Sequence, residues 1–99
     1  MSDLRIPPAL DRHLVSAAHV AATTGDPAAG ALDAVLEQVV RTLRAQGADR
    51  AAIARALSDV FTGLAFPYER TAVAKRYAAL EARAIQMADR VTLEERPVS

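Results

Sequence analysis

Residues 68–93 read YERTAVAKRYAALEARAIQMADRVTL. Along this stretch apolar side chains recur at alternating intervals of four and three residues, at Val73, Tyr77, Leu80, Ala84, Met87 and Val91. This spacing places the side chains on one face of an α-helix and is typical of a helix that packs along its whole length. The stretch therefore predicts a long C-terminal helix over 68–93, about 39 Å from end to end at ~1.5 Å per residue.

Three shorter segments upstream show the same helical spacing of apolar residues. They predict helices at about 9–24, 27–46 and 49–63. Gly25 and Gly47 suit the left-handed residue that closes a helix. Asp26 followed by Pro27 suits a helix start, because a carboxylate accepts from the free N–H groups of the first turn and proline lacks that N–H. Asp49 suits the start of the third helix for the same reason.

These four helices, without any segment of strand-like alternation, define the expected architecture. Short turns between them favour antiparallel or steeply angled neighbours, as in a helical bundle. The sequence predicts one all-α domain over residues 1–99, a small four-helix bundle-like domain with short turns and a long C-terminal helix. Gly63 is expected to end the third helix, and Phe61 and Phe66 are expected to plug one end of the bundle.

The charge balance and the absence of cysteine narrow the class of protein. Twelve Lys and Arg residues balance twelve Asp and Glu residues, whereas a strongly basic chain would have indicated nucleic acid or a membrane surface as the partner. Without cysteine, neither disulfides nor thiol chemistry is expected. No apolar run approaches the ~20 residues that span a bilayer. We therefore expect a cytoplasmic protein that does not contact a membrane.

The apolar stripe of the last helix is longer than the preceding helix can cover. A helix over 49–63 spans only about 20 Å at the same rise per residue. The first two helices cover the remainder in one interpretation, and a second copy of the chain covers it in the other. The second interpretation predicts a homodimer whose self-association seam is the stripe itself: Val73, Tyr77, Leu80, Ala84, Met87 and Val91.

A row of arginines flanks this stripe at heptad spacing, at Arg76, Arg83 and Arg90. We expect these side chains to stay unpaired within their own helix, where oppositely charged neighbours three or four residues away would otherwise neutralise them. Three kinds of group are then open to them. They are an acidic partner protein, phosphate groups, and acids of a neighbouring helix such as Asp33 and Glu37.

Tyr68 opens the predicted last helix and is the aromatic residue that we expect to be most exposed. Tyrosine and arginine together are typical of protein contacts. The candidate face for a partner protein or a nucleic acid therefore consists of Tyr68, Arg70, Lys75, Arg76, Arg83 and Arg90.

Residues 43–57 read LRAQGADRAAIARAL, and this segment resembles the first half of a bacterial helix-turn-helix. Members of that family have a helix, a glycine turn, a polar cap and then a helix that carries Ile-Ala, here Ile53-Ala54, with Leu57 three residues later. The resemblance implies DNA binding, with the next helix entering the major groove. It ends near Ser58, where the family turns but this apolar stripe continues. A recognition helix starting at Tyr68 would offer Arg70, Thr71, Lys75 and Arg76.

The chain shows none of the residue patterns that catalysis requires. His13 and His19 are six residues apart and so lie on different faces of one helix, where they cannot share a metal ion. Paired acids, a nucleophile elbow and a glycine-rich phosphate loop are all lacking, so we expect no catalytic residue, no cofactor and no metal. The sequence predicts a small bacterial-type regulatory protein, homodimeric and not an enzyme, that binds another protein through its helices. A DNA-binding transcriptional regulator is the alternative.

Overall fold

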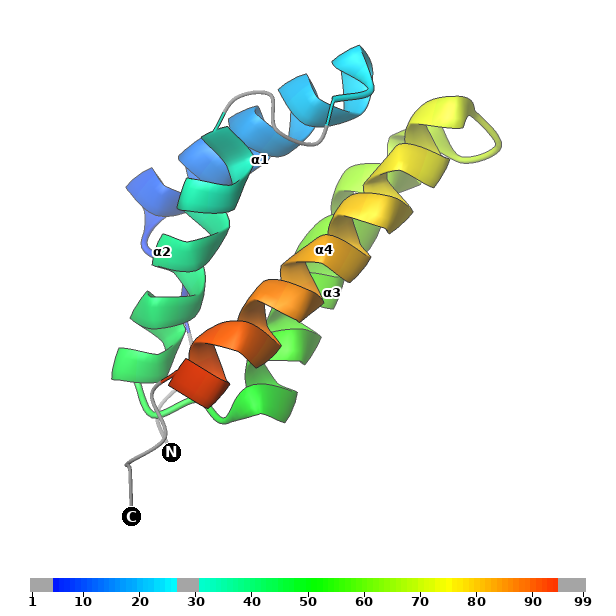
Figure 1. The fold of residues 1–99 in the computed structure, drawn as a ribbon. Coiled ribbons are helices and arrows are strands. Elements are labelled where there is room, and N and C mark those ends of the chain that lie inside the picture. The colour runs from blue at the N-terminus through cyan, green and yellow to red at the C-terminus, as the bar shows by residue number, and fades with distance from the viewer. Residues whose placement is uncertain (1–4, 27–30, 95–99) are drawn as a thin grey trace.

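Four α-helices account for most of the computed structural model, which describes residues 5–26 and 31–94. A single 3-10 turn, η2, joins the last two of them, and no strand occurs in these two ranges (Figure 1). The all-α prediction is therefore confirmed. The elements are α1 Pro8–Thr24, α2 Leu32–Ala45, α3 Arg50–Ala65, η2 Phe66–Tyr68 and α4 Ala72–Glu94.

The ends of the first three helices follow the local signals in the sequence. Gly25 and Gly47 have positive φ angles of 76° and 93° and follow α1 and α2, as predicted. The Asp49 side chain accepts a hydrogen bond of 2.8 Å from the Ala52 N–H and so caps α3. The described part of α2 begins after Ala31, which has a φ of 56°. The predicted start at Pro27 lies outside the described residues.

The connection between α3 and α4 differs from the prediction. α3 does not stop at Gly63 but continues to Ala65, since a single Gly is tolerated within a helix. Pro67 then lies in η2, and Arg70 has a φ of 68°. The Thr71 hydroxyl accepts from the Ala74 N–H at 3.4 Å, so α4 begins at residue 72 and not at 68. Tyr68 is consequently not part of α4.

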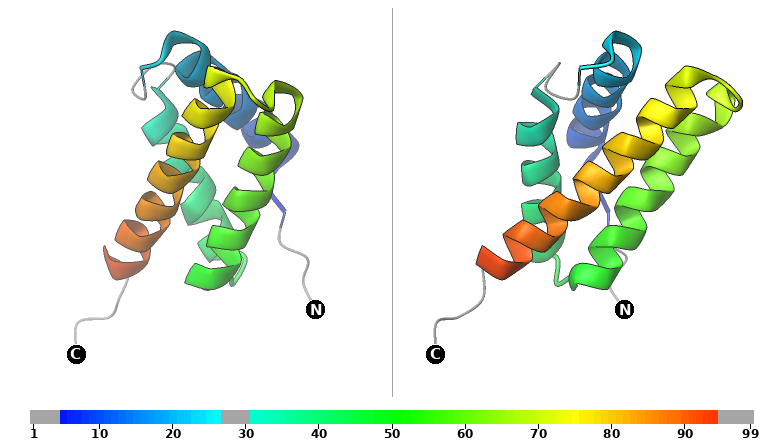
Figure 2. Two further views of the ribbon diagram at one scale, coloured as in Figure 1. Left: turned by 90° about the vertical axis from the view of Figure 1, so that its right-hand side faces the viewer. Right: turned by 45° about the vertical axis from the view of Figure 1, so that its right-hand side comes forward.

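The helices form two hairpins that lie against each other. α3 and α4 run antiparallel and side by side, and α1 and α2 form the second hairpin (Figures 1 and 2). α4 packs against all three other helices, whereas α1 has few contacts with α3. The molecule measures 45 × 27 × 22 Å along its principal axes. α4 is therefore the element that joins the two hairpins.

The apolar stripe of α4 lies in the core of the single chain. Five of its members, Tyr77, Leu80, Ala84, Met87 and Val91, are buried, and Val73 is half-buried. α1 and α2 cover the part of the stripe that α3 leaves open, as the first of the two interpretations required. The predicted self-association seam is thus wrong, because its five buried side chains already face other helices of the same molecule and are not accessible to a second copy.

The two phenylalanines have opposite environments. Phe61 is 1% exposed and belongs to the core, as predicted. Phe66 is 72% exposed, so the prediction that it plugs the bundle is wrong. Tyr68, expected to be the most exposed aromatic residue, is instead half-buried. The reason is that α3 continues two residues beyond Gly63 and is followed by η2, which places Phe66 on the outer side of the α3–α4 hairpin.

Candidate functional site

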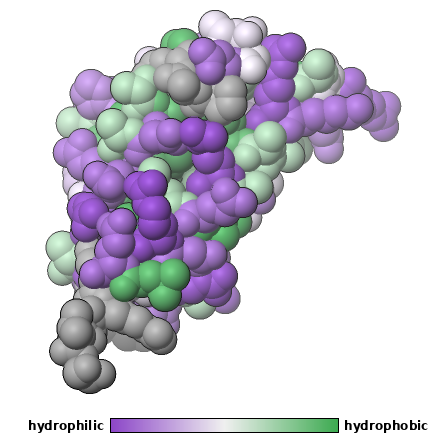
Figure 3. Space-filling model, in the orientation of Figure 1, coloured by the Kyte–Doolittle hydropathy of each residue, from purple (hydrophilic) through white to green (hydrophobic). Residues whose placement is uncertain are grey.

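The predicted arginine row meets the acids of α2. Arg83 donates two hydrogen bonds, of 2.7 and 2.6 Å, to the carboxylate of Asp33. Arg90 donates to Glu37 at 3.3 Å. The sequence left three kinds of group open as partners of these arginines, and Arg83 and Arg90 bind the third kind, acids of a neighbouring helix. Hydrophilic side chains accordingly cover most of the face formed by α2 and α4 (Figure 3).

Arg76 pairs with backbone carbonyls in place of an acid. Its guanidinium donates to the carbonyl oxygens of Ala22 and Thr23 at 3.0 and 3.3 Å, which are among the last carbonyls of α1 and have no partner within that helix. The expectation that the row is unpaired within α4 is wrong for Arg90. Glu94 follows four residues later, and its Oε1 lies 3.9 Å from Arg90 Nε. The row thus fastens α4 to α1 and α2.

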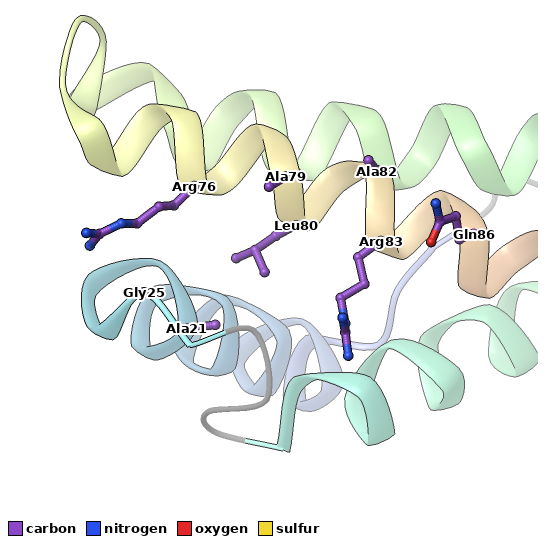
Figure 4. Close-up of a pocket in the computed structure, with 8 residues that line it drawn as sticks. All are labelled: Ala21, Gly25, Arg76, Ala79, Leu80, Ala82, Arg83 and Gln86. Carbon is purple, nitrogen blue, oxygen red and sulfur yellow. The ribbon is translucent and has the colours of Figure 1, made fainter.

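A groove lies between α1 and α4 beside two of these arginines. It measures about 320 Å³, and its apolar floor contains Leu80 and Ala21. Arg76 and Arg83 reach from α4 on either side of Leu80 (Figure 4). Both guanidinium groups already donate hydrogen bonds within the protein, so an acidic ligand would have to compete with these bonds. We do not place the functional site in this groove.

Arg83 lowers the pKa of the Asp33 carboxyl below its ordinary value of 3.8, chiefly through their hydrogen bonds. A group whose pKa is lower in the folded state adds stability above its unfolded pKa and loses it as the pH falls through the folded value. The Asp33→Asn variant should therefore be less stable than the natural protein near pH 7. The difference should shrink as the pH falls below about 3.8 and vanish only below the lowered pKa of the folded state. Both side chains are more than 40% exposed, so we expect less than about 1 kcal/mol.

Urea unfolding of both proteins between pH 2.5 and 7 measures this difference. Asp59→Asn is the control, because Asp59 is exposed and takes part in no ion pair of the described chain. A difference that persists unchanged at the lowest pH would contradict the assignment.

The chain reverses between α3 and α4 at three residues that we call the η2 corner: Phe66, Pro67 and Tyr68. On one side of the corner lies the inner groove, of about 530 Å³, between α1 and the end of the α3–α4 hairpin. Its lining includes Val15 and His19 of α1 together with Tyr68 and Tyr77. The groove is open because α1 and α3 scarcely touch.

Three ring side chains line one end of the inner groove. The Tyr68 ring centroid lies 6.4 Å from that of His19 and 6.0 Å from that of Tyr77. The Tyr77 hydroxyl is 3.4 Å from His19 Nδ1. Burial, with a smaller contribution from Tyr68, raises the pKa of the Tyr77 phenol, so this group keeps its proton at neutral pH. The arrangement offers aromatic surface and no activated acid, base or nucleophile.

The outer groove lies on the other side of the corner, between α3 and the first half of α4. It measures about 240 Å³ and includes Phe66 of the corner. Two acids line it, Glu69 before α4 and Glu81 on α4, and no basic residue does. Neither acid forms an ion pair within the described chain. The outer groove is thus apolar and negatively charged.

The structure separates the residues of the predicted partner face. Tyr68 lines the inner groove, whereas Arg76, Arg83 and Arg90 are engaged with α1 and α2. Arg70 and Lys75 are exposed and form no ion pair in residues 5–26 and 31–94. The two acids of the outer groove and Val15 were missed. Glu69 precedes α4, Glu81 lies on α4 and Val15 lies on α1, and no local pattern in the sequence connects these three positions.

No protein-family model matches the chain, and neither a curated protein nor a solved structure shows significant similarity to it. Among the described residues, no helix is both long and apolar enough to cross a membrane. The same residues contain no group of three or more His, Cys, Asp or Glu side chains suited to a metal ion. The resemblance of residues 43–57 to a helix-turn-helix stays a prediction. Of the residues offered by the next helix, Arg76 already bonds to α1.

Proposed function

We propose that this protein is a non-enzymatic interaction module that binds another protein at the η2 corner. The observation that carries the proposal is the exposure of Phe66, whose side chain is 72% accessible between two grooves. Large aromatic side chains are enriched at the centres of protein interfaces. An exposed aromatic residue flanked by further apolar surface is typical of such a site.

The corner also has the rigidity that a binding surface requires. The Glu69 N–H donates to the Phe66 carbonyl at 3.3 Å, and the Thr71 N–H donates to the Tyr68 carbonyl at 3.0 Å. Pro67 restricts the backbone further. Because the turn is ordered before any partner arrives, the free energy of binding is not reduced by the entropic cost of ordering it.

The inner groove extends the same surface onto α1. Val15 is 36% exposed on its rim, and Tyr68 presents part of its ring there. Tyrosine suits such a position because it combines a large apolar area with a hydroxyl that tolerates water. A partner that contacts Phe66 therefore has adjoining apolar surface to cover. The homodimer expected from the sequence stays a prediction, and the stripe of α4 no longer provides its interface.

A photo-cross-linking amino acid placed at Phe66, at Val15 or at Gln38 tests the proposal in the cells that produce the protein. Gln38 is the matched control, since it is exposed on α2 away from both grooves. We expect protein adducts from positions 66 and 15 and none from position 38. Equal adducts from all three positions, or none from positions 66 and 15, would contradict the proposal. An adduct of twice the mass of the chain would identify a second copy as the partner.

A further inference from the structure

We infer that the outer groove receives a basic, amphipathic helical segment of a partner protein, with an apolar side chain against Phe66 and a cation near the two acids. This inference rests on the proposed function and adds the chemistry of the partner. Its first support is the charge of the groove, which has Glu69 and Glu81 in its lining and no basic residue. Complementary charge at an interface selects partners and speeds their association.

The acids are available because the protein does not use them. Neither Glu69 nor Glu81 forms an ion pair in the described chain, although Asp33, Glu37 and Asp89 all pair with arginines. Arg70 is the cation nearest to Glu69 in sequence and Arg83 the one nearest to Glu81, and neither comes within 4 Å of either carboxylate. No cation of the described chain therefore pairs with the two carboxylates of this groove, whose charge repels phosphate groups and acidic peptides and attracts lysine or arginine.

The size and walls of the groove favour a helix over a small molecule. Its volume of about 240 Å³ is below the ~300–1,000 Å³ of small-molecule sites, and corresponds to one or two inserted side chains. Three of its lining residues are alanines, Ala65, Ala74 and Ala78, and such short side chains allow a partner helix to approach closely. Helix-in-groove recognition works in this way, through a few apolar anchors spaced along one face.

The inference is tested with two designed peptides, each an amphipathic helix about four turns long. One carries Leu and a single Phe on one face and Lys on the other, and the second has Glu in place of every Lys. Fluorescence anisotropy measures the affinity of each for the full-length protein at low and at high salt. We expect the cationic peptide to bind at least about tenfold more tightly than the anionic one, with the preference weakening as salt screens the charges.

Three variants locate the binding. We expect Phe66→Ala to lower the affinity for the cationic peptide by at least about tenfold, since the substitution removes the central aromatic contact. The double variant Glu69→Gln, Glu81→Gln should lower the affinity for the cationic peptide by about tenfold. Leu93→Ala is the matched control, because Leu93 is 63% exposed at the opposite end of α4 and its loss should leave the affinity unchanged. All four positions are at least partly exposed, so these variants should fold normally, which circular dichroism checks.

Equal binding of the two peptides would overturn the charge assignment, and so would an unchanged affinity in the double glutamine variant. If Phe66→Ala still weakened both peptides equally, the η2 corner would remain the binding surface and only its partner chemistry would be wrong. Absence of binding by the cationic peptide would also overturn the inference. The proposed function is tested independently by the cross-linking experiment, and the absence of cross-links from position 66 would contradict it.

Discussion

We expect Ala84→Glu to abolish the cooperative unfolding transition of this protein. Ala84 is fully buried on the face of α4 that packs into the core. Glutamate there adds volume to a packed site, at a cost of about 1–3 kcal/mol, and buries an unpaired charge, at a cost of several more. A domain of this size has only about 5–15 kcal/mol of stability in total. Circular dichroism during heating measures the loss.

The matched control is Ala82→Glu, two residues earlier on the exposed face of the same helix. The same substitution there should change the free energy of unfolding by about 0.5 kcal/mol or less. The pair also decides between the two interpretations of the apolar stripe. If the stripe were an interface between two copies, Ala84→Glu would give a folded monomer, and sedimentation would show the change in mass. A folded Ala84→Glu monomer would therefore contradict the burial described above.

Phe61→Ala is expected to lower the melting temperature by roughly 12 °C or more. The Phe61 side chain is 1% exposed, and its truncation both removes apolar contact and leaves a cavity, at a cost of about 3–5 kcal/mol. Phe66→Ala, five residues later, should change stability little because that side chain is 72% exposed. Thermal unfolding of the two variants, side by side, makes the comparison. Similar melting temperatures for both would contradict the opposite environments of these phenylalanines.

The helices themselves could be predicted because their signals are local. Apolar periodicity, the Asp49 cap and the glycines at 25 and 47 each act within a few residues, and all of them occur as expected. The same periodicity selected five of the buried side chains of α4, although Val73 is only half-buried and the buried Ala88 lies outside the predicted stripe. The predicted start of α4 at residue 68 is wrong, because apolar spacing does not show where the turn before a helix ends. In the structure Pro67 lies in a 3-10 turn, and the helix begins where Thr71 can cap it.

The candidate site was accessible to sequence reasoning only in part. Tyr68 was singled out as a contact residue and lines the inner groove. Phe66 was assigned to the core, because its apolar side chain by itself does not show on which side of a turn it lies. Glu69 and Glu81 are twelve residues apart, and their common groove appears only once α3 lies beside α4.

The sequence by itself determined that the C-terminal part of the chain forms a long amphipathic helix and that this helix belongs to a small all-α domain, since spacing along one chain decides both. Only the tertiary structure decided what covers the stripe and where the arginines go. α1 and α2 close over it within the same molecule, and Arg83 meets Asp33 fifty residues away. The physical reason is that burial and ion pairing depend on distances between helices, which the periodicity of each helix does not contain.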